Sequence, residues 1–220
     1  MNAFHVLRDA WYFFSHNLLS ITRLCLPLVV LESLLQQQVS AAVGVESATV
    51  YGILVGLLFY PLYTGALIRF LAARSNGESP ALLDLLASSL QLWPRFVLLA
   101  GLSTLAIMLG ASLFVLPGLW IMVKLAFAEY LLVLRGLAPL QAIQESFELT
   151  SGYFWQILLC ILCVMVPLWL LDWSTQPAEG TEPDMLFGVL LGSVNRFLQL
   201  FATVMLFRLF MLRETLPADE

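Results

Sequence analysis

Long apolar runs recur along the chain, and each is close to the length that crosses a lipid bilayer. A transmembrane helix needs about 20 apolar residues, because each residue rises about 1.5 Å and the hydrocarbon core is about 30 Å thick. Six runs meet this requirement, at residues 18–39, 50–73, 96–115, 117–134, 154–173 and 185–211. The pattern therefore predicts an all-α, polytopic membrane protein with six transmembrane helices.

The third and fourth runs follow each other almost without a break, with Pro117-Gly118 between their apolar stretches. Together they cover 39 residues, or about 58 Å of helix, which is just enough for two crossings. We therefore expect a tight transmembrane hairpin that turns at Pro117-Gly118. A re-entrant loop remains the alternative, because Arg95 and Arg135 would face the same side in both arrangements.

A short segment with apolar residues on one helical face precedes each pair of runs. Such helices lie in the plane of the membrane interface rather than across the membrane. The apolar residues are Phe4, Leu7, Trp11 and Phe14 in the first segment, Leu82, Leu86, Leu90 and Trp93 in the second, and Leu140, Ile143 and Phe147 in the third.

These segments predict three repeats, each made of an interfacial helix and a transmembrane hairpin. The repeats cover residues 1–75, 76–136 and 137–213 of a single membrane domain (1–213), and residues 214–220 form a short cytoplasmic tail. Identity between the repeats is weak, and loops between spans also look amphipathic by chance. The duplication therefore rests on the pattern alone.

Composition supports a membrane protein and excludes nucleic-acid binding. The chain of 220 residues is 60% hydrophobic and only 11% charged, with a mean hydropathy of +0.90, whereas soluble domains are about 25% charged. Its net charge is −5, and Lys124 is its single lysine. No basic face is available to neutralise the phosphates of a nucleic acid.

The arginines lie on one side of the predicted topology, which is the side that faces the cytoplasm in membrane proteins. They are Arg8, Arg69, Arg74, Arg95, Arg135, Arg208 and Arg213. The opposite side has no Lys or Arg and carries Glu46, Glu179, Glu182 and Asp184. We therefore expect cytoplasmic N- and C-termini and, since no mitochondrial targeting pattern is present, a location in the bacterial inner membrane.

Four stretches of the sequence carry a resemblance to a known family. They are LPGLW at 116–120, APLQAIQESFELT at 138–150, LFRLFML at 206–212 and TGALI at 64–68. On these residues, the chain resembles the YciC-like family of uncharacterised bacterial inner-membrane proteins over most of its length. The resemblance implies a fold and an inner-membrane location, and it supplies no catalytic residues. The chain departs from the family pattern at Glu129, where relatives often have an uncharged residue such as proline.

Five charged residues lie five or more positions away from the ends of the predicted spans: Arg23, Glu32, Lys124, Glu129 and Arg196. A charge at mid-bilayer costs about 2.5–3.5 kcal/mol unless it is paired or hydrated. Counting residues from the span ends places Glu32, Lys124 and Arg196 in an outer layer, and Arg23 and Glu129 in an inner layer. We predict that Glu32 meets Lys124, Arg196 or both, and that Glu129 meets Arg23. Snorkelling of Arg23 and Lys124 to the nearer interface is the alternative.

Uncharged polar residues near the outer layer allow two interpretations. They line a polar cavity in the first and only hydrogen-bond neighbouring helices in the second, which is the commoner use of such residues. The residues are Gln36, Gln37, Gln38, Ser193, Asn195 and Gln199.

No sequence motif predicts catalysis, a metal centre or a cofactor. The chain has no HExxH, no phosphate-binding glycine loop and no cluster of histidines, so we expect a non-enzymatic protein without metal or cofactor. Because the intramembrane charges are few, we favour a structural or assembly protein that binds membrane lipids, partner membrane proteins or a second copy of itself. The alternative is a transport or lipid-handling protein in which Glu32, Lys124 and Arg196 contact a headgroup.

Overall fold

The chain is helical over nearly all of residues 3–43, 45–174 and 185–214, which are the residues that the computed structural model describes. The helices of this part are α1 (Ala3–His16), α2 (Leu18–Val43), α3 (Val45–Ser75), α4 (Leu82–Leu113), α5 (Val115–Leu125), α6 (Ala128–Arg135), α7 (Pro139–Leu149), α8 (Phe154–Ser174) and α9 (Met185–Glu214). The all-α prediction is confirmed.

Several helices are long and apolar enough to cross a membrane, which confirms a polytopic membrane protein. Five such stretches are present among the described residues, at Leu18–Val39, Val50–Ser75, Leu82–Leu113, Val115–Arg135 and Gly192–Glu214. A sixth is obtained if α7 and the first part of α8 are taken as one span, although they are bent by 107°. The α5–α6 stretch serves as one span despite the break between its two helices.

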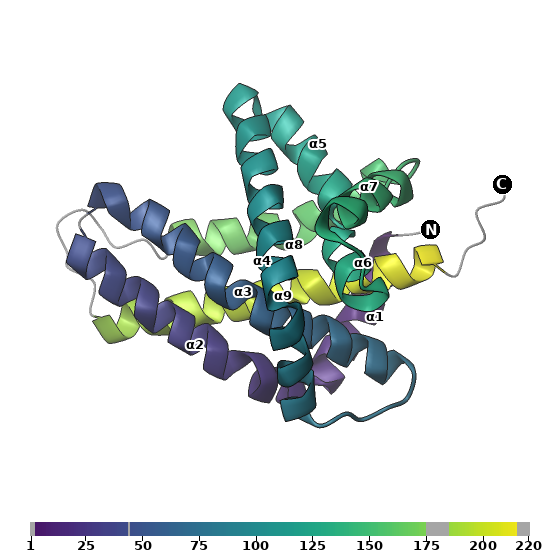
Figure 1. Cartoon of the computed structure of the whole chain (residues 1–220), viewed down its shortest axis with the longest axis horizontal. Coiled ribbons are helices and arrows are strands. Elements are labelled where there is room, and N and C mark those ends of the chain that lie inside the picture. The colour runs from purple at the N-terminus through teal and green to yellow at the C-terminus, as the bar shows by residue number, and fades with distance from the viewer. Residues whose placement is uncertain (1–2, 44, 175–184, 215–220) are drawn as a thin grey trace.

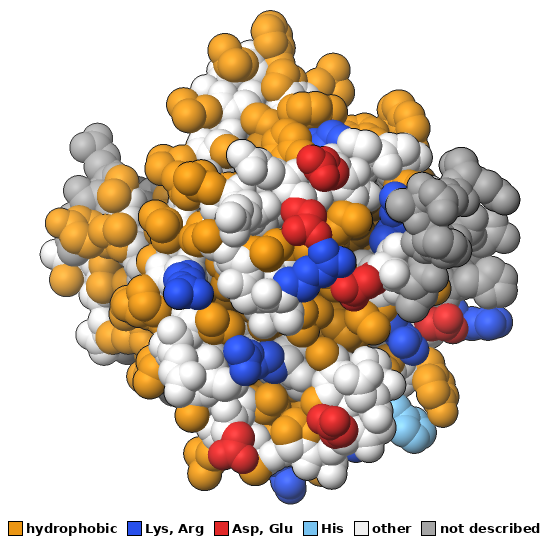
Figure 2. All heavy atoms as spheres, turned by 45° about the vertical axis from the view of Figure 1, so that its right-hand side comes forward, with side chains coloured by type: hydrophobic (Ala, Val, Ile, Leu, Met, Phe, Trp, Pro, Cys, Tyr) orange, Lys and Arg blue, Asp and Glu red, His pale blue; other side chains and the backbone are white. Residues whose placement is uncertain are grey.

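Figure 1 shows two helical hairpins that run across the view, α2 with α3 and α8 with α9. The hairpin of α4 and α5 rises steeply from this group and ends in a projecting tip. Figure 2 shows hydrophobic side chains over this tip, while charged side chains gather lower on the same face. At the tip, Leu113, Phe114, Val115 and Leu116 are all more than two thirds exposed, which suits contact with lipid tails.

The core lies where α3, α6 and α9 meet, and α2 and α4 close it from the sides. Aromatic rings dominate it, as in the stacked pair of Tyr130 and Phe210, whose centroids lie 5.6 Å apart. The largest fully buried side chains are Ile21, Leu24, Leu67, Ile68, Leu71, Phe96, Leu99, Phe127, Tyr130, Leu131, Phe207 and Phe210.

The second predicted interfacial helix is not a separate element. Residues 82–93 continue without interruption into the following span as the single helix α4. The reason is a buried stripe at helical spacing that includes Leu85, Ser89 and Phe96 and crosses the expected boundary. Trp93 supports the continuation, because its indole N–H donates to the Leu58 carbonyl of α3 at 2.9 Å.

The turn of the α4–α5 hairpin was predicted at Pro117-Gly118, and this prediction is wrong. The chain reverses at Phe114, whose backbone is extended (φ −162°, ψ 157°). Pro117 lies in the first turn of α5, where backbone N–H groups have no acceptor within the helix, so the N–H that proline lacks costs no hydrogen bond. Gly118 and Gly110 face each other closely, since a Cβ on Gly110 would lie 3.1 Å from the Gly118 Cα, and a Cβ on Gly118 would lie 3.0 Å from the backbone of Ala111. The two glycines therefore allow the arms to touch directly after the turn.

The helices α1 and α7 are separate elements, as predicted for interfacial segments, but their buried faces differ from those expected. In α1, Val6, Ala10 and Phe14 are buried, whereas Trp11 is 61% exposed. In α7 the buried stripe includes the small residues Ala142 and Ser146 rather than the larger apolar ones. Small side chains bring α7 close to its neighbours. The bulky residues Trp11 of α1 and Leu140 of α7 are left toward the surroundings.

The predicted orientation depends partly on residues that lie outside the described part of the chain. Glu179, Glu182 and Asp184 and the tail at 215–220 are among them, as is the side chain of Glu46. The side chain of Phe4, predicted on the apolar face of the first segment, is also outside it.

Candidate functional site

Glu32 and Arg196 meet inside the bundle on facing helices. Arg196 on α9 donates through Nη1 to the Glu32 carboxylate and through Nη2 to the side-chain oxygen of Gln36, both on α2. The Glu32 side chain is fully buried, whereas that of Arg196 is 27% exposed. The Gln36 amide donates to the Gly52 carbonyl of α3 at 3.2 Å. These three residues, the Glu32 cluster, join α2, α3 and α9, and the ion pair offsets the cost of the buried carboxylate.

Lys124 does not join the Glu32 cluster, although residue counts place it at the same depth. Its Nζ donates to Ser151 Oγ at 2.9 Å and to the Phe147 carbonyl at 3.2 Å, at the C-terminal end of α7. Helix C-termini carry unpaired carbonyls and a partial negative charge, so they stabilise a cation without a carboxylate. Of the two predicted partners of Glu32, Arg196 is in contact and Lys124 is not, because α7 folds back across the end of α5, which residue counts along one helix do not reveal.

Ser146 of α7 bridges the break between α5 and α6. Its hydroxyl donates to the Lys124 carbonyl at 2.7 Å and accepts the Phe127 N–H at 3.2 Å. The side chain is fully buried, so it pairs an acceptor and a donor that the helix break would otherwise leave buried and unpaired. We call Lys124, Phe127, Ser146, Phe147 and Ser151 the α5–α7 junction. Beside the junction, the rings of Trp120 and Phe147 pack edge to face with centroids 5.8 Å apart, which brings together the stretches at 116–120 and 138–150 that carry the family resemblance.

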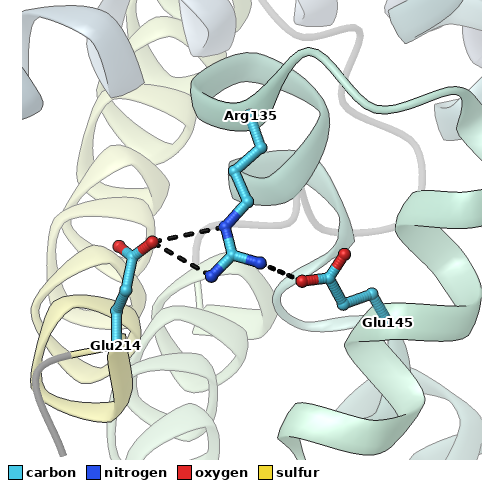
Figure 3. Close-up of polar contacts among 3 residues, drawn as sticks. All are labelled: Arg135, Glu145 and Glu214. Atoms are coloured by element: carbon cyan, nitrogen blue, oxygen red, sulfur yellow. Dashed lines mark hydrogen bonds and ion pairs between the residues drawn. The ribbon is translucent and has the colours of Figure 1, made fainter.

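Arg135 joins three helices at the far end of α6 (Figure 3). Its guanidinium forms ion pairs with Glu145 of α7 and with Glu214 of α9, the latter at 3.1 Å. The side chains of Arg135 and Glu214 are both 38% exposed, so water screens these pairs and their stabilising effect is small. They orient α7 and the end of α9 relative to α6.

Arg23 and Glu129 do not form the predicted inner pair. Arg23 lies on the exposed side of α2, opposite the buried Leu24 and Cys25. Glu129 on α6 instead meets Tyr60 of α3, whose hydroxyl lies 2.9 Å from both carboxylate oxygens. Among the described residues, no Lys, Arg or His forms an ion pair with Glu129. The helical phase of α2 turns Arg23 outward, and this overrides the agreement in depth.

A cavity of about 230 Å³ lies between α3, α4, α5, α6, α8 and α9, and both Glu129 and Arg196 line it. Its apolar walls include Ile107, Met122 and Met165. The polar side chains in its lining are Tyr60, Tyr63, Ser103, Glu129, Tyr130, Arg196, Gln199 and Thr203. A cavity with mostly apolar walls and a few converging polar groups is typical of a ligand-binding site.

The cavity can bind charge of either sign at two different places. Arg196 has five N–H donors, and the Glu32 cluster accepts from only two of its nitrogens. Glu129 is an acceptor whose two oxygens share a single hydroxyl donor. Among the polar residues considered in the sequence, Gln199 lines the cavity, while Gln36 hydrogen-bonds neighbouring helices. Both interpretations of these residues therefore hold, each for a different residue.

Two residues of this site carry no signal in the apolar pattern alone. Tyr60 lies one residue before Pro61 within a predicted span, where a tyrosine is unremarkable. Ser146 is hidden in an amphipathic segment, yet it belongs to the spacing Ala142, Ser146 and Thr150, in which all three residues are small and buried. Small residues every fourth position indicate a close helix contact, and this signal would have found Ser146.

The described residues contain no group of three His, Cys, Asp or Glu that could hold a metal ion. Cys25 and Cys160 are buried and Cys163 is exposed, all as free thiols.

The helices and the cavity define a polytopic membrane protein with a partly open cavity among its helices, lined by both apolar and polar side chains. The family comparison is specific: the chain belongs to the uncharacterised protein family UPF0259, whose model matches residues 43–212. The match includes the α5–α7 junction and Arg196, and it begins after Glu32.

Curated relatives in bacteria are membrane proteins of the same family. The UPF0259 membrane protein of Sodalis glossinidius is 26% identical over 169 residues, which are 75% of this chain and 66% of the relative. Those of Yersinia pestis strain Pestoides F and Yersinia pseudotuberculosis serotype O:1b are each 25% identical over 188 residues, or 84% of this chain and 70% of theirs. The chain thus matches about two thirds of the length of these relatives. No solved structure matches it.

Proposed function

We propose that this protein is a non-enzymatic membrane protein that binds a membrane lipid by its headgroup, in lipid handling or transport. The observation that carries the proposal is the cavity of about 230 Å³ that holds both Glu129 and Arg196. Pockets for drug-sized ligands are about 300–1,000 Å³. The smaller cavity suits a headgroup whose acyl chains remain among the apolar surfaces of the helices.

The distribution of polar contacts supports this proposal over a purely structural role for the cavity residues. A structural polar group inside a membrane protein is usually fully paired with its neighbours, because an unpaired one is costly there. Glu129 has one neutral donor for two oxygens, and Arg196 has donors left over. A polar ligand in the cavity would provide the missing partners.

A structural or assembly role is the second candidate, and the α5–α7 junction favours it. There, Lys124 and Ser146 are each paired within the chain, and Arg135 links α7 to α9. Such a locked unit with an exposed apolar hairpin tip is suited to hold partner membrane proteins or a second copy of the chain. In this role the cavity would be a by-product of imperfect packing.

The proposed setting is the bacterial inner membrane, with both termini in the cytoplasm. Its support is the asymmetry of arginine, since Arg74, Arg135 and Arg213 each occupy the last turn of a helix that ends on the proposed cytoplasmic side. Cysteine accessibility at single sites near Ser75 and Gly136 would test it. Labelling from the periplasm at either site would contradict the orientation.

The test of the proposed function is to fill the cavity and measure bound lipid. We expect Ser103→Phe to place a ring in the cavity from α4 and to remove lipid that stays with the wild-type protein in native mass spectrometry. The matched control is Ser112→Phe on the same helix, because Ser112 is exposed and its hydroxyl bonds only the Leu109 carbonyl within α4. Equal lipid retention by the two variants would contradict the proposal.

A further inference from the structure

We infer that the cavity recognises an organic ammonium group through Glu129, and that the preferred ligand is an ammonium–phosphate zwitterion of the ethanolamine type. The inference rests on the proposed function, because it names the chemical class of the ligand in the same cavity. It is carried by three observations: the uncompensated charge of Glu129, the tyrosine rings beside it and the position of Arg196 in the same lining.

The first observation is the balance of charge around the cavity. Arg196 is already paired with the Glu32 carboxylate, so the two contribute no net charge. Lys124 is held at the end of α7, so it adds no positive charge to the lining. Glu129 is therefore a carboxylate that no described Lys, Arg or His pairs with. A cation in the cavity would stabilise its ionised form, whereas a purely anionic ligand would not.

The second observation is the aromatic wall. Tyr60, Tyr63 and Tyr130 all line the cavity beside Glu129, and the rings of Tyr60 and Tyr63 pack edge to face with centroids 5.8 Å apart. Aromatic rings attract an ammonium group that lies within about 6 Å of their faces. A carboxylate combined with tyrosine rings recognises an organic ammonium group better than it recognises a strongly hydrated metal ion.

The third observation concerns the opposite charge of the ligand. Arg196 keeps free N–H donors beyond those that it gives to Glu32 and Gln36, and guanidinium donors suit phosphate oxygens. Gln199 and Thr203 in the same lining add uncharged donors. A zwitterion would thus place its ammonium group at Glu129 and its phosphate at Arg196, with no net change in the charge of the cavity.

Two sources supply this chemistry, a phospholipid with an ethanolamine headgroup and a free zwitterion such as phosphoethanolamine. To separate them, we would reconstitute the full chain in nanodiscs with equal amounts of phosphatidylethanolamine and phosphatidylglycerol. Native mass spectrometry after ejection from the discs then reports which lipid is retained. In parallel, phosphoethanolamine and glycerol phosphate are added to delipidated protein in detergent, and thermal unfolding is measured.

The expected result is enrichment of the ethanolamine lipid on the wild-type protein by about tenfold, since a hydrogen bond between two charged groups changes affinity by at least that factor. Glu129→Gln keeps an acceptor for Tyr60 but removes the charge. It should abolish the enrichment. The matched control is Glu148→Gln on the exposed face of α7, which should retain the enrichment.

The outcomes separate this inference from the proposed function. Equal retention of both lipids by the wild type, or enrichment that survives Glu129→Gln, overturns the ammonium site but leaves a lipid-binding cavity. Stabilisation by phosphoethanolamine without lipid enrichment keeps the ammonium site and overturns the lipid as its source. Failure to retain any lipid or to respond to either solute overturns both.

Discussion

The α5–α7 junction and the polar cavity contain similar kinds of residues, but their polar groups are used differently. In the junction, the Ser146 hydroxyl both donates and accepts, and the Lys124 ammonium has two oxygen partners. In the cavity, the Glu129 carboxylate shares one hydroxyl, and Arg196 has donors left over. We propose on this difference that the junction holds the fold together, while the cavity takes a partner that the chain does not itself provide.

Two of the stretches that carry the family resemblance lie near the junction rather than in the cavity. The stretches at 116–120 and 138–150 meet beside the junction, where the rings of Trp120 and Phe147 pack edge to face with centroids 5.8 Å apart. Glu129 lies between these stretches in the sequence but faces the cavity.

The largest expected effect comes from the Glu32 cluster, which borders the cavity and is the part of it that is structurally paired. Replacing Arg196 by Leu leaves the buried Glu32 carboxylate without its partner and should cost about 3–5 kcal/mol of unfolding free energy. The measurement is unfolding in mixed detergent micelles. The double exchange Glu32→Arg with Arg196→Glu should recover part of the loss, and no recovery would contradict the pair.

A smaller effect is expected from the junction. Ser146→Ala leaves the Lys124 carbonyl and the Phe127 N–H without their partner and should destabilise the protein by about 1–3 kcal/mol. The control is Ser112→Ala, an exposed serine whose loss should change unfolding by less than about 0.5 kcal/mol. If both variants unfold alike, Ser146 does not bridge the break.

The glycine contact in the hairpin predicts an effect of similar or lower size. A Cβ on Gly118 would lie 3.0 Å from atoms of Ala111, so Gly118→Ala should push the arms of the hairpin apart and cost about 1–3 kcal/mol. Gly101 is the matched control on α4, because a Cβ there meets nothing within 4 Å. Gly101→Ala should be neutral or slightly stabilising, and thermal unfolding of the two variants in one detergent distinguishes them.

The smallest effect is expected at Arg135, where charges are paired but exposed. Arg135→Ala should destabilise the protein by only about 0–1 kcal/mol, because water screens its ion pairs with Glu145 and Glu214. The effect should also shrink as salt is added. A loss as large as that of Ser146→Ala would show that this network is more than an orienting contact.

Apolar runs of span length were sufficient to predict the helices and the membrane fold, because the bilayer fixes the length and composition of a crossing helix. They did not predict that residues 82–93 continue into α4, since the stripe that includes Leu85, Ser89 and Phe96 becomes visible only when α3 is in place. The turn was misplaced at Pro117-Gly118, because these residues serve helix entry and close packing rather than the reversal itself.

Depth in the membrane predicted only some of the contacts between charged residues. The others depend on the direction in which each residue faces around its helix. Glu32 and Arg196 match in both depth and phase, and the structure brings them together. Arg23 matches Glu129 in depth but faces outward, so Glu129 contacts Tyr60 instead. The partner of Lys124 depends on α7 folding back over α5, which is a tertiary arrangement that no single run of sequence encodes.

One comparison of variants tests the contrast between cavity and junction most directly. Glu129→Gln and Ser146→Ala are reconstituted in the same nanodiscs of ethanolamine and glycerol lipids, and the retained lipids are measured by native mass spectrometry. We predict that Glu129→Gln loses the preference for the ethanolamine lipid, while the folded fraction of Ser146→Ala keeps it. If Ser146→Ala loses the preference and Glu129→Gln retains it, the assignment of the ligand to the cavity is wrong.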